Sequence, residues 1–307
     1  MSRPTTSRRT AIAARASAAA TAAEARAYGL RERRVDVGDC SLALLEGGPA
    51  DAPTVVLVHG YSADRVVWVR FARHLLRDHR VIVPELAGHG ATGFTSGVGH
   101  SAPAQAARLA TLLDRLGIDS AHVGGNSMGG FVAATLAVEH PDRVTSLLLS
   151  DAVGVASPEP SEAELLFRQG RNPFLLESVA DFPDFYAMTM ARPPFLPAAL
   201  RAAVAADYVA RREELAEIFA DFYGVATLDD RLGEITAPTL VMWGEEDRLV
   251  HPSTARAWAG GIEGARTVLY PGIGHMPMLE APGRSAADYR AFLARVAAAD
   301  RRRDEVP

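Results

Sequence analysis

Short apolar runs alternate with helical patterns along most of the chain, and this alternation limits the possible folds more than any other feature. The runs are rich in Val, Ile and Leu, which is typical of strands buried on both faces of a parallel sheet. We expect strands at 34–37, 41–46, 54–58, 80–84, 121–124, 145–150, 239–243 and 266–270. Helical patterns lie at 65–77, 104–116, 129–140, 252–260 and 282–299. The repeated order predicts an α/β fold with a mostly parallel, doubly wound sheet.

One long interval breaks the alternation. Residues 155–234 have helical periodicity and hold ten of the chain's eighteen Phe and Tyr residues. Because so long an insertion in a compact domain is usually a functional lid or subdomain, we interpret it as a helical cap. The expected organisation is a basic Ala/Arg-rich N-terminal tail at 1–30, a core at 31–154, the cap at 155–234, the rest of the core at 235–299, and a charged C-terminal tail at 300–307.

The first thirty residues carry Arg3, Arg8, Arg9, Arg15 and Arg26 against Glu24, a local charge of +4. The pattern favours a frayed, partly helical tail. A basic helix can also lie on an anionic membrane surface, although the apolar residues here are mostly Ala and predict weak peripheral contact. We expect a cytoplasmic location, with membrane periphery or export as alternatives.

Charge and composition exclude several classes of function. The net charge of −5 argues against a nucleic-acid partner, because such proteins neutralise phosphates with clustered positive charge. The chain contains no lysine, which excludes a P-loop ATPase and a pyridoxal Schiff-base enzyme. Cys40 is the only cysteine, so neither an intrachain disulfide nor a cysteine metal cluster can form. We expect no metal and no cofactor, and the sequence leaves the oligomeric state open.

The strongest motif is Gly125-Asn126-Ser127-Met128-Gly129, a G-x-S-x-G pattern between an expected strand and an expected helix. This strand–turn–helix setting is the one in which the pattern marks a nucleophilic serine. Glycines two residues to either side of Ser127 allow the sharp turn that raises its hydroxyl above the sheet. The alternative, a Gly-rich turn without catalytic meaning, fits this setting less well.

A serine needs a base, and the base needs a carboxylate. His275 follows the last expected strand on a Gly-rich loop, and the other eight histidines lie in less suitable places. Asp247 follows the strand before it, and Asp151, which ends the strand at 145–150, is its rival. The order Ser127, Asp247, His275 matches a Ser-acid-His triad, so we favour Asp247 over Asp151.

Two backbone N–H groups are expected to stabilise the oxyanion, those of Met128 and Tyr61. Met128 follows the nucleophile, and Tyr61 lies in the loop after the strand at 54–58. Two other motifs are rejected. The G-x-G-x-x-A pattern at 97–102 lacks a preceding strand, and His74 and His79 are five residues apart, which does not place two metal ligands on one helix face.

Taken together, these motifs resemble those of the α/β-hydrolases over about residues 34–298. Within that superfamily the chain is similar to the monoacylglycerol-lipase branch and to bacterial family V lipases. The resemblance rests on residues 56–64 with Trp68, 88–90, 125–130, 243–247 and 274–275. The resemblance implies the same roles as those assigned above to the nucleophile Ser127, the base His275, the acid Asp247 and the oxyanion donors Tyr61 and Met128. One departure is Glu85-Leu86-Ala87 before Gly88-His89-Gly90, where the family has Asp-Leu-Pro, and this bears on the substrate fit.

The sequence therefore predicts a serine carboxylic-ester hydrolase acting on a small-molecule ester or lipid, with monoacylglycerol-like or other medium- to long-chain acyl esters favoured. An apolar tunnel under the cap is the reason, since each buried methylene contributes about 0.8 kcal/mol. The expected tunnel-lining residues are Phe167, Phe174, Phe185, Met188 and Phe195. Two alternatives remain: a carbon–carbon bond hydrolase of diketones using the same triad, and a non-catalytic ligand-binding relative.

Overall fold

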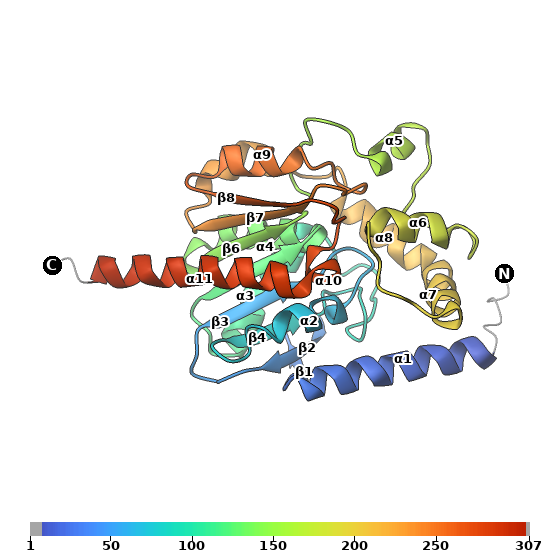
Figure 1. Cartoon of the computed structure of the whole chain (residues 1–307), viewed down its shortest axis with the longest axis horizontal. Helices are drawn as coiled ribbons and strands as arrows, with labels where there is room; N and C mark the ends of the chain where they lie inside the picture. Colours follow the sequence, from blue (N-terminus) through green and yellow to red (C-terminus); the bar gives the residue numbers. More distant parts are fainter. Residues whose placement is uncertain (1–7, 305–307) are drawn as a thin grey trace.

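An eight-stranded sheet forms the centre of the molecule (Figure 1). The computed structural model describes residues 8–304, so the expected tail segments 1–7 and 305–307 lie outside the described residues. The strands are β1 (Arg31–Asp36), β2 (Ser41–Gly47), β3 (Thr54–Val58), β4 (Arg80–Pro84), β5 (Ala121–Asn126), β6 (Val144–Ser150), β7 (Thr239–Gly244) and β8 (Arg266–Tyr270). Their order is β1-β2-β4-β3-β5-β6-β7-β8. β1 and β2 are antiparallel to their neighbours, and every pairing from β4 to β8 is parallel. The predicted mostly parallel sheet is confirmed.

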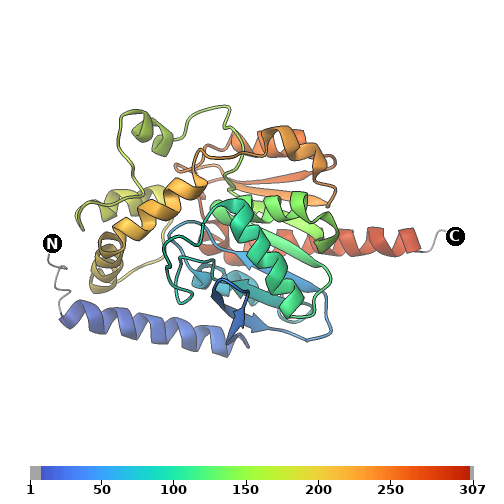
Figure 2. The same cartoon turned by 180° about the vertical axis from the view of Figure 1, so that it is seen from behind.

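Helices cover both faces of the sheet (Figures 1 and 2). The two faces form separate cores because successive strand residues point to opposite sides. Val56 and Leu147 pack with α3 (Ala102–Arg115), α4 (Met128–Glu139) and α9 (Thr254–Gly261). Val55 and Leu148 belong to the other core, with α2 (Val69–Ala72), α10 (Pro277–Glu280) and α11 (Pro282–Asp304). This alternation explains why the central strands are apolar throughout their length.

Most expected helices are present, but the single helix expected at 65–77 is wrong. The segment forms the 3₁₀ turn η1 (Arg65–Trp68), the short helix α2 and further turns up to His79. Three valines at 66, 67 and 69 lower the helix propensity there, since β-branched side chains lose rotamer freedom in a helix. At the other end of the chain, α11 continues to Asp304 and passes the boundary expected at residue 299.

Four helices lie between β6 and β7, within the interval interpreted as a cap. They are α5 (Glu162–Arg168), α6 (Phe182–Thr189), α7 (Ala198–Ala210) and α8 (Arg212–Phe222), and the turn η3 (Asp229–Glu234) follows them. The other 3₁₀ turn, η2 (Pro141–Arg143), follows α4. Figure 1 shows α5–α8 gathered at one end of the sheet, and Figure 2 shows the same arrangement from behind. The end is the one where the parallel strands finish, so the cap helices stand over the carboxyl edge of the sheet.

The N-terminal segment forms the helix α1 (Arg8–Ala27), which lies beside α7 of the cap (Figure 1). The end of this helix is attached to the core. Glu24 accepts a hydrogen bond from Arg70 at 2.8 Å, Ala25 is buried, and the Arg73 guanidinium lies over the ring of Tyr28. The structure therefore differs from the expected frayed tail, because this end of the helix has tertiary contacts that the sequence pattern does not reveal.

Candidate active site

Ser127 occupies a strained turn between β5 and α4. Its φ is 56° and its ψ is −121°, a conformation that costs a non-glycine residue free energy and persists only when the surrounding structure enforces it. A Cβ added at Gly125 would collide with the backbone of Gly129, and one added at Gly129 would collide with the carbonyl of His59. Only glycine fits at these positions, which explains the motif in physical terms. The turn remains open to solvent at Ser127, because this residue is partly exposed whereas its neighbours in the chain are buried.

His275 and Asp247 form the second part of the site. The imidazole Nδ1 of His275 lies 2.7 Å from Oδ2 of Asp247, and both side chains are buried. The other carboxylate oxygen of Asp247 accepts hydrogen bonds from the backbone N–H groups of Leu249 and Val250 at 2.8 and 3.0 Å. A carboxylate fixed in this way holds the imidazole with Nδ1 protonated and Nε2 free to accept a proton.

Asn126 connects the nucleophile turn to the histidine loop. Its side-chain amide donates hydrogen bonds to the backbone carbonyls of His275 at 3.0 Å and Ser150 at 3.2 Å. On the far side of the loop, Glu280 accepts a hydrogen bond from the Gly274 N–H at 2.9 Å. The sequence analysis missed both residues. Their only signal was position, Asn126 directly before the nucleophile and Glu280 five residues after the histidine.

Asp151 is a second buried carboxyl group beside the same histidine. One carboxylate oxygen of Asp151, one of Asp247 and one ring nitrogen of His275 all lie within 4.8 Å of one another. Asp151 accepts hydrogen bonds from Gly244 N–H and Ser150 Oγ at 2.9 Å each. Burial, and then the neighbouring Asp247 carboxylate, raise the pKa of Asp151 well above its usual range. A raised pKa disfavours the charged form that would partner an imidazolium ion, and the 2.7 Å contact to Nδ1 of His275 belongs to Asp247, so we favour Asp247.

The same three residues have the spacing of a metal site. The 2.7 Å distance between His275 Nδ1 and Asp247 is that of a hydrogen bond, and a histidine nitrogen that donates a hydrogen bond has no lone pair for a metal. The donor set therefore suits a hydrogen-bonded pair better than a bound cation.

The loop after β3 lies against the nucleophile turn. A Cβ at Gly60 would lie 3.1 Å from Cβ of Ser127. Tyr61 follows Gly60, and its backbone N–H makes no hydrogen bond within the part of the chain that the structure describes. Met128 is the first residue of α4, where a backbone N–H has no acceptor within the helix. Both expected oxyanion donors thus belong to segments adjacent to Ser127.

His59 supports this loop. Its ring is buried, Nδ1 lies 2.8 Å from the carbonyl of Gly60, and Nε2 accepts a hydrogen bond from the Leu86 N–H at 3.1 Å. Burial lowers the pKa of His59, so the ring is neutral at neutral pH and can bridge the two loops as donor and acceptor.

Aromatic side chains from the cap pack around the ring of Tyr61. Phe174, Phe219 and Phe222 have ring centroids 5.9, 5.6 and 5.3 Å from it. Phe167 stacks on Phe174 and Phe219 at 6.0 and 5.5 Å. These four rings place a continuous apolar surface next to the loop that carries the expected oxyanion donor.

The remaining expected tunnel residues lie in three different places. Phe185 is buried against Phe174 and Tyr208. Met188 is buried in a small cluster with Ala163 and Leu249. Phe195 is 92% exposed on the loop between α6 and α7, so the structure does not bring it together with the others. Prolines at 193, 194 and 197 give this loop its extended course, which carries Phe195 away from the core of the cap.

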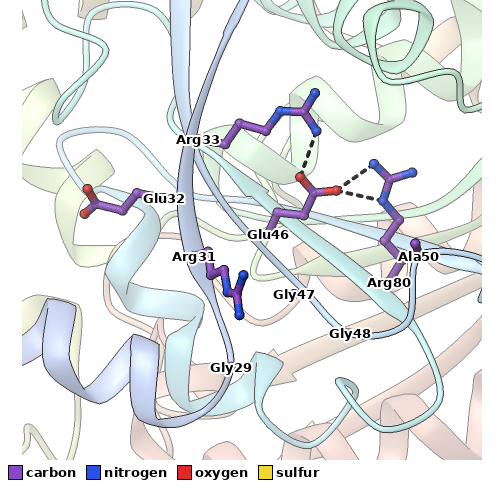
Figure 3. A pocket seen from close by; sticks show the side chains of 9 residues that line it. All are labelled: Gly29, Arg31, Glu32, Arg33, Glu46, Gly47, Gly48, Ala50 and Arg80. Atoms are coloured by element: carbon purple, nitrogen blue, oxygen red, sulfur yellow. Dashed lines mark hydrogen bonds and ion pairs between the residues drawn. The ribbon is translucent and has the colours of Figure 1, made fainter.

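A surface pocket of about 460 Å³ lies elsewhere, at the end of the sheet where β4 begins. Glu46 accepts hydrogen bonds from Arg33 at 3.0 Å and from Arg80 at 2.8 Å (Figure 3). Arg80 starts its parallel strand, whereas Ser127, Asp247 and His275 follow the ends of theirs. The pocket is therefore at the edge of the sheet opposite the candidate site, and its paired charges have no part in it.

Comparison with known proteins gives a consistent result. The family model described as the alpha/beta hydrolase fold matches residues 53–282. Lipase 1 of Psychrobacter immobilis is 32% identical over 80% of this chain and 78% of its own length. Monoacylglycerol lipase abhd6-B of Xenopus laevis is 24% identical over 83% of this chain and 79% of its own. The crystal structure of a bacterial membrane phospholipase A superposes with a TM-score of 0.89 and 33% identity, covering 93% of both chains.

A second group of relatives carries a different name. The 2-hydroxy-6-oxononadienedioate/2-hydroxy-6-oxononatrienedioate hydrolase of Klebsiella pneumoniae is 28% identical over 82% of this chain and 88% of its own length. The family match and the 32% identity to a lipase confirm the resemblance derived from the motifs. This chain belongs to the α/β-hydrolase-fold family, and its relatives in that family include lipases.

Proposed function

We propose that this protein is a serine carboxylic-ester hydrolase with Ser127 as nucleophile, His275 as base and Asp247 as the acid that orients the base. The observation that carries the proposal is the Asp247–His275 pair at 2.7 Å, on a loop that Asn126 ties to the nucleophile turn. The neutral imidazole accepts the Ser127 proton as Oγ attacks the ester carbonyl. The imidazolium then protonates the departing alcohol, and the acyl group stays on Oγ. Water attacks this acyl-enzyme with His275 as base, which releases the acid and restores the serine.

The backbone N–H groups of Tyr61 and Met128 are the proposed oxyanion donors. Each tetrahedral intermediate places a negative charge on the former carbonyl oxygen, and preset donors stabilise it without reorganisation. One such donor typically contributes about 3 kcal/mol to lowering the barrier. The proposal is supported by the position of Met128 at the start of α4 and by the unpaired N–H of Tyr61 within the described residues.

We infer that the substrates are medium- to long-chain acyl esters of the monoacylglycerol type. The support is the apolar surface of Phe167, Phe174, Phe219 and Phe222 around Tyr61. Phe174 and Phe167 are the strongest candidates for contacting an acyl chain. Phe185 and Met188 are buried in packing contacts, and Phe195 is the weakest candidate because it is exposed. The names of the lipase relatives agree with this class of substrate.

A second candidate, hydrolysis of a carbon–carbon bond in a diketone, is favoured by the relative from Klebsiella pneumoniae. That reaction would require cationic or polar groups to bind a substrate carboxylate near the triad. Arg211 is a cation at the cap–core boundary, and it already bonds to the carbonyl of Gly88 and to Glu214. This arrangement favours an ester substrate. A non-catalytic binding role would leave the intact triad residues unexplained.

We also propose weak peripheral contact with anionic membranes through the N-terminal segment. The basic helix α1 lies beside α7, and the exposed Phe195 belongs to the loop that leads into α7. Basic and aromatic residues are typical of interfacial membrane contacts, and the first thirty residues carry a local charge of +4. Among residues 8–304, no helix is both long and apolar enough to cross a bilayer. The expected domain boundaries and the cytoplasmic location remain proposals alongside this one.

Rates on aryl esters and monoacylglycerols of increasing acyl length test the function. We expect the wild-type protein to release acid from these esters, with kcat/KM rising with chain length, and Ser127→Ala to abolish turnover while the circular dichroism spectrum stays unchanged. A fluorophosphonate probe should label the wild-type protein at Ser127 and leave Ser127→Ala unlabelled. Preferred turnover of a vinylogous diketone carboxylate would support the carbon–carbon hydrolase instead, and retained esterase activity in Ser127→Ala would refute the choice of nucleophile.

A further inference from the structure

The loop that carries Tyr61 contains a strained residue. Ser62 has a φ of 58°, in the left-handed region that favours glycine, and only two other non-glycine residues between 8 and 304 share this property, Ser127 and Asp151. Both of those lie at the candidate active site. A serine holds a left-handed conformation only where its surroundings enforce it, so the contacts of Ser62 must explain why the loop keeps its shape.

Tyr208 supplies those contacts from the cap helix α7. Its hydroxyl oxygen lies 3.0 Å from Oγ of Ser62, and the same hydroxyl donates a hydrogen bond to the backbone carbonyl of Ser62 at 3.3 Å. Both contacts form together when Ser62 Oγ–H donates to the phenol oxygen and the phenol O–H donates to the carbonyl. Burial raises the pKa of Tyr208 to about 12, so the phenol keeps this proton near neutral pH.

The next residues of the cap bind the neighbouring parts of the same site. The hydroxyl of Tyr61 donates to the backbone carbonyl of Leu215 in α8 at 2.7 Å. Between these two contacts, Arg211 donates to the carbonyl of Gly88 at 2.9 Å. The segment where α7 meets α8 therefore contacts the side chain of Tyr61, the backbone of Ser62 and a second core loop. The direction of the Tyr61 N–H depends on the orientation of the peptide plane between Gly60 and Tyr61. The contacts to Tyr61 and Ser62 restrain the chain directly after this plane.

We propose that Tyr208 is a positioning residue for ester hydrolysis: by holding Ser62 in its left-handed conformation, it keeps the backbone N–H of Tyr61 directed at the oxyanion. The proposal deepens the proposed function and rests on it. It assigns the cap a role in the chemical step, in addition to binding the acyl chain. Tyr208 acts through the loop and does not touch the reacting atoms.

The test compares Tyr208→Phe with the wild-type protein on a short, water-soluble aryl ester, whose acyl group barely reaches the cap. Loss of an oxyanion donor lowers kcat by about 10²–10³-fold, and a displaced donor less, so we expect kcat to fall by about tenfold while KM changes by less than about twofold. The single-turnover acylation rate should fall by the same factor. Tyr186→Phe is the matched control, because that hydroxyl on α6 makes no hydrogen bond among the described residues.

A rescue experiment separates positioning from a general loss of cap structure. Glycine adopts a positive φ without strain, so Ser62→Gly should keep the loop in place without the phenol. We expect Ser62→Gly alone to retain nearly wild-type kcat, and Ser62→Gly combined with Tyr208→Phe to recover most of the tenfold loss. Ser62→Ala with Tyr208→Phe should stay impaired, because alanine cannot relieve the strain.

Two results would overturn the proposal: an unchanged kcat in Tyr208→Phe, or an impaired Tyr208→Phe that Ser62→Gly fails to rescue while circular dichroism shows an intact fold. Failure of the proposed function itself is recognised beforehand, because the wild-type protein would then show no Ser127-dependent turnover of the same ester.

Discussion

The side-chain amide of Asn126 donates a hydrogen bond to the backbone carbonyl of His275, 3.0 Å away, across 149 residues of sequence. Asn126 directly precedes the proposed nucleophile, and His275 is the proposed base. One side chain therefore joins the nucleophile turn directly to the histidine loop. Its second bond, to the carbonyl of Ser150, attaches both loops to the end of β6.

Asn126→Ala should lower both stability and activity. The substitution removes the side-chain donor to the carbonyl of His275, and a buried group left unsatisfied costs about 1–3 kcal/mol. The carbonyl of Ser150 keeps its hydrogen bond from the Ser127 N–H at 3.0 Å. We also expect kcat to fall by about ten- to a hundredfold, because a misplacement of about 1 Å at a catalytic group has an effect of that order. Urea unfolding and steady-state kinetics measure the two effects. Thr145→Ala, at the opposite end of β6, should change neither by much, and an unchanged kcat in Asn126→Ala would show that the sheet alone positions the base.

Two substitutions test whether Asp247 or Asp151 is the acid of the triad. In Asp247→Asn an amide faces Nδ1 of His275 and favours the wrong imidazole tautomer, so kcat should fall by up to about 10⁴-fold. In Asp151→Asn the amide can still accept from the Gly244 N–H and contact Ser150, and we expect a change within about threefold. Both variants are isosteric, and each serves as the control for the other. The reverse order of effects would assign the acid to Asp151.

The raised pKa of Asp151 leads us to expect that the stability of the protein depends on pH. Burial and the nearby Asp247 carboxylate raise its pKa in the folded protein. Above the unfolded pKa of about 4, the unfolded chain releases this proton while the folded protein retains it, so rising pH favours unfolding by up to about 1.4 kcal/mol per pH unit until the folded pKa is reached. The stabilising effect of Asp151 is thus complete in acid and is lost as the pH rises.

Asp151→Asn removes this proton and its pH dependence. The free energy of unfolding of the variant, relative to wild type, should therefore increase as the pH rises above the unfolded pKa of about 4. Chemical denaturation at a series of pH values measures the difference. A difference that stays constant over this range would mean that Asp151 is ionised in the folded protein.

The pattern of apolar runs was sufficient to predict the fold class, because strands buried on both faces have a continuous apolar signature that turns and helices lack. The motif around Ser127 and the position of His275 pointed to residues that the structure places around one edge of the sheet. The choice between Asp247 and Asp151 could only be weighed, since both follow strands that end at this edge. It depends on which carboxylate contacts the imidazole, and that is set by side-chain geometry.

Other features depend on contacts between distant segments, and the sequence contains no local signal for them. Tyr208 and Ser62 are 146 residues apart, and neither belongs to a recognisable motif. The attachment of α1 through Glu24 and Arg70 joins residues that are 46 apart in the sequence. The prediction of one helix at 65–77 was wrong because it used the periodic pattern alone, whereas three valines lower the helix propensity of this segment and the chain forms local turns.

Gly129 offers the sharpest test of why the nucleophile turn has its sequence. A Cβ at this position would collide with the backbone carbonyls of Val58 and His59, and backbone atoms of a buried strand end cannot move aside as a flexible side chain can. We expect Gly129→Ala to lower the free energy of unfolding by about 3 kcal/mol or more and to abolish esterase activity, since overpacking a well-packed region costs about 1–3 kcal/mol and here also displaces the loop that carries Tyr61. Gly233→Ala is the matched control, because its φ is not positive and a Cβ there would meet no atom within 4 Å. Thermal unfolding and ester hydrolysis are measured for both variants. If Gly129→Ala and Gly233→Ala have equal stability and equal activity, α4 can shift away from β3. The second glycine of the motif would then not be required for the close approach of helix and strand.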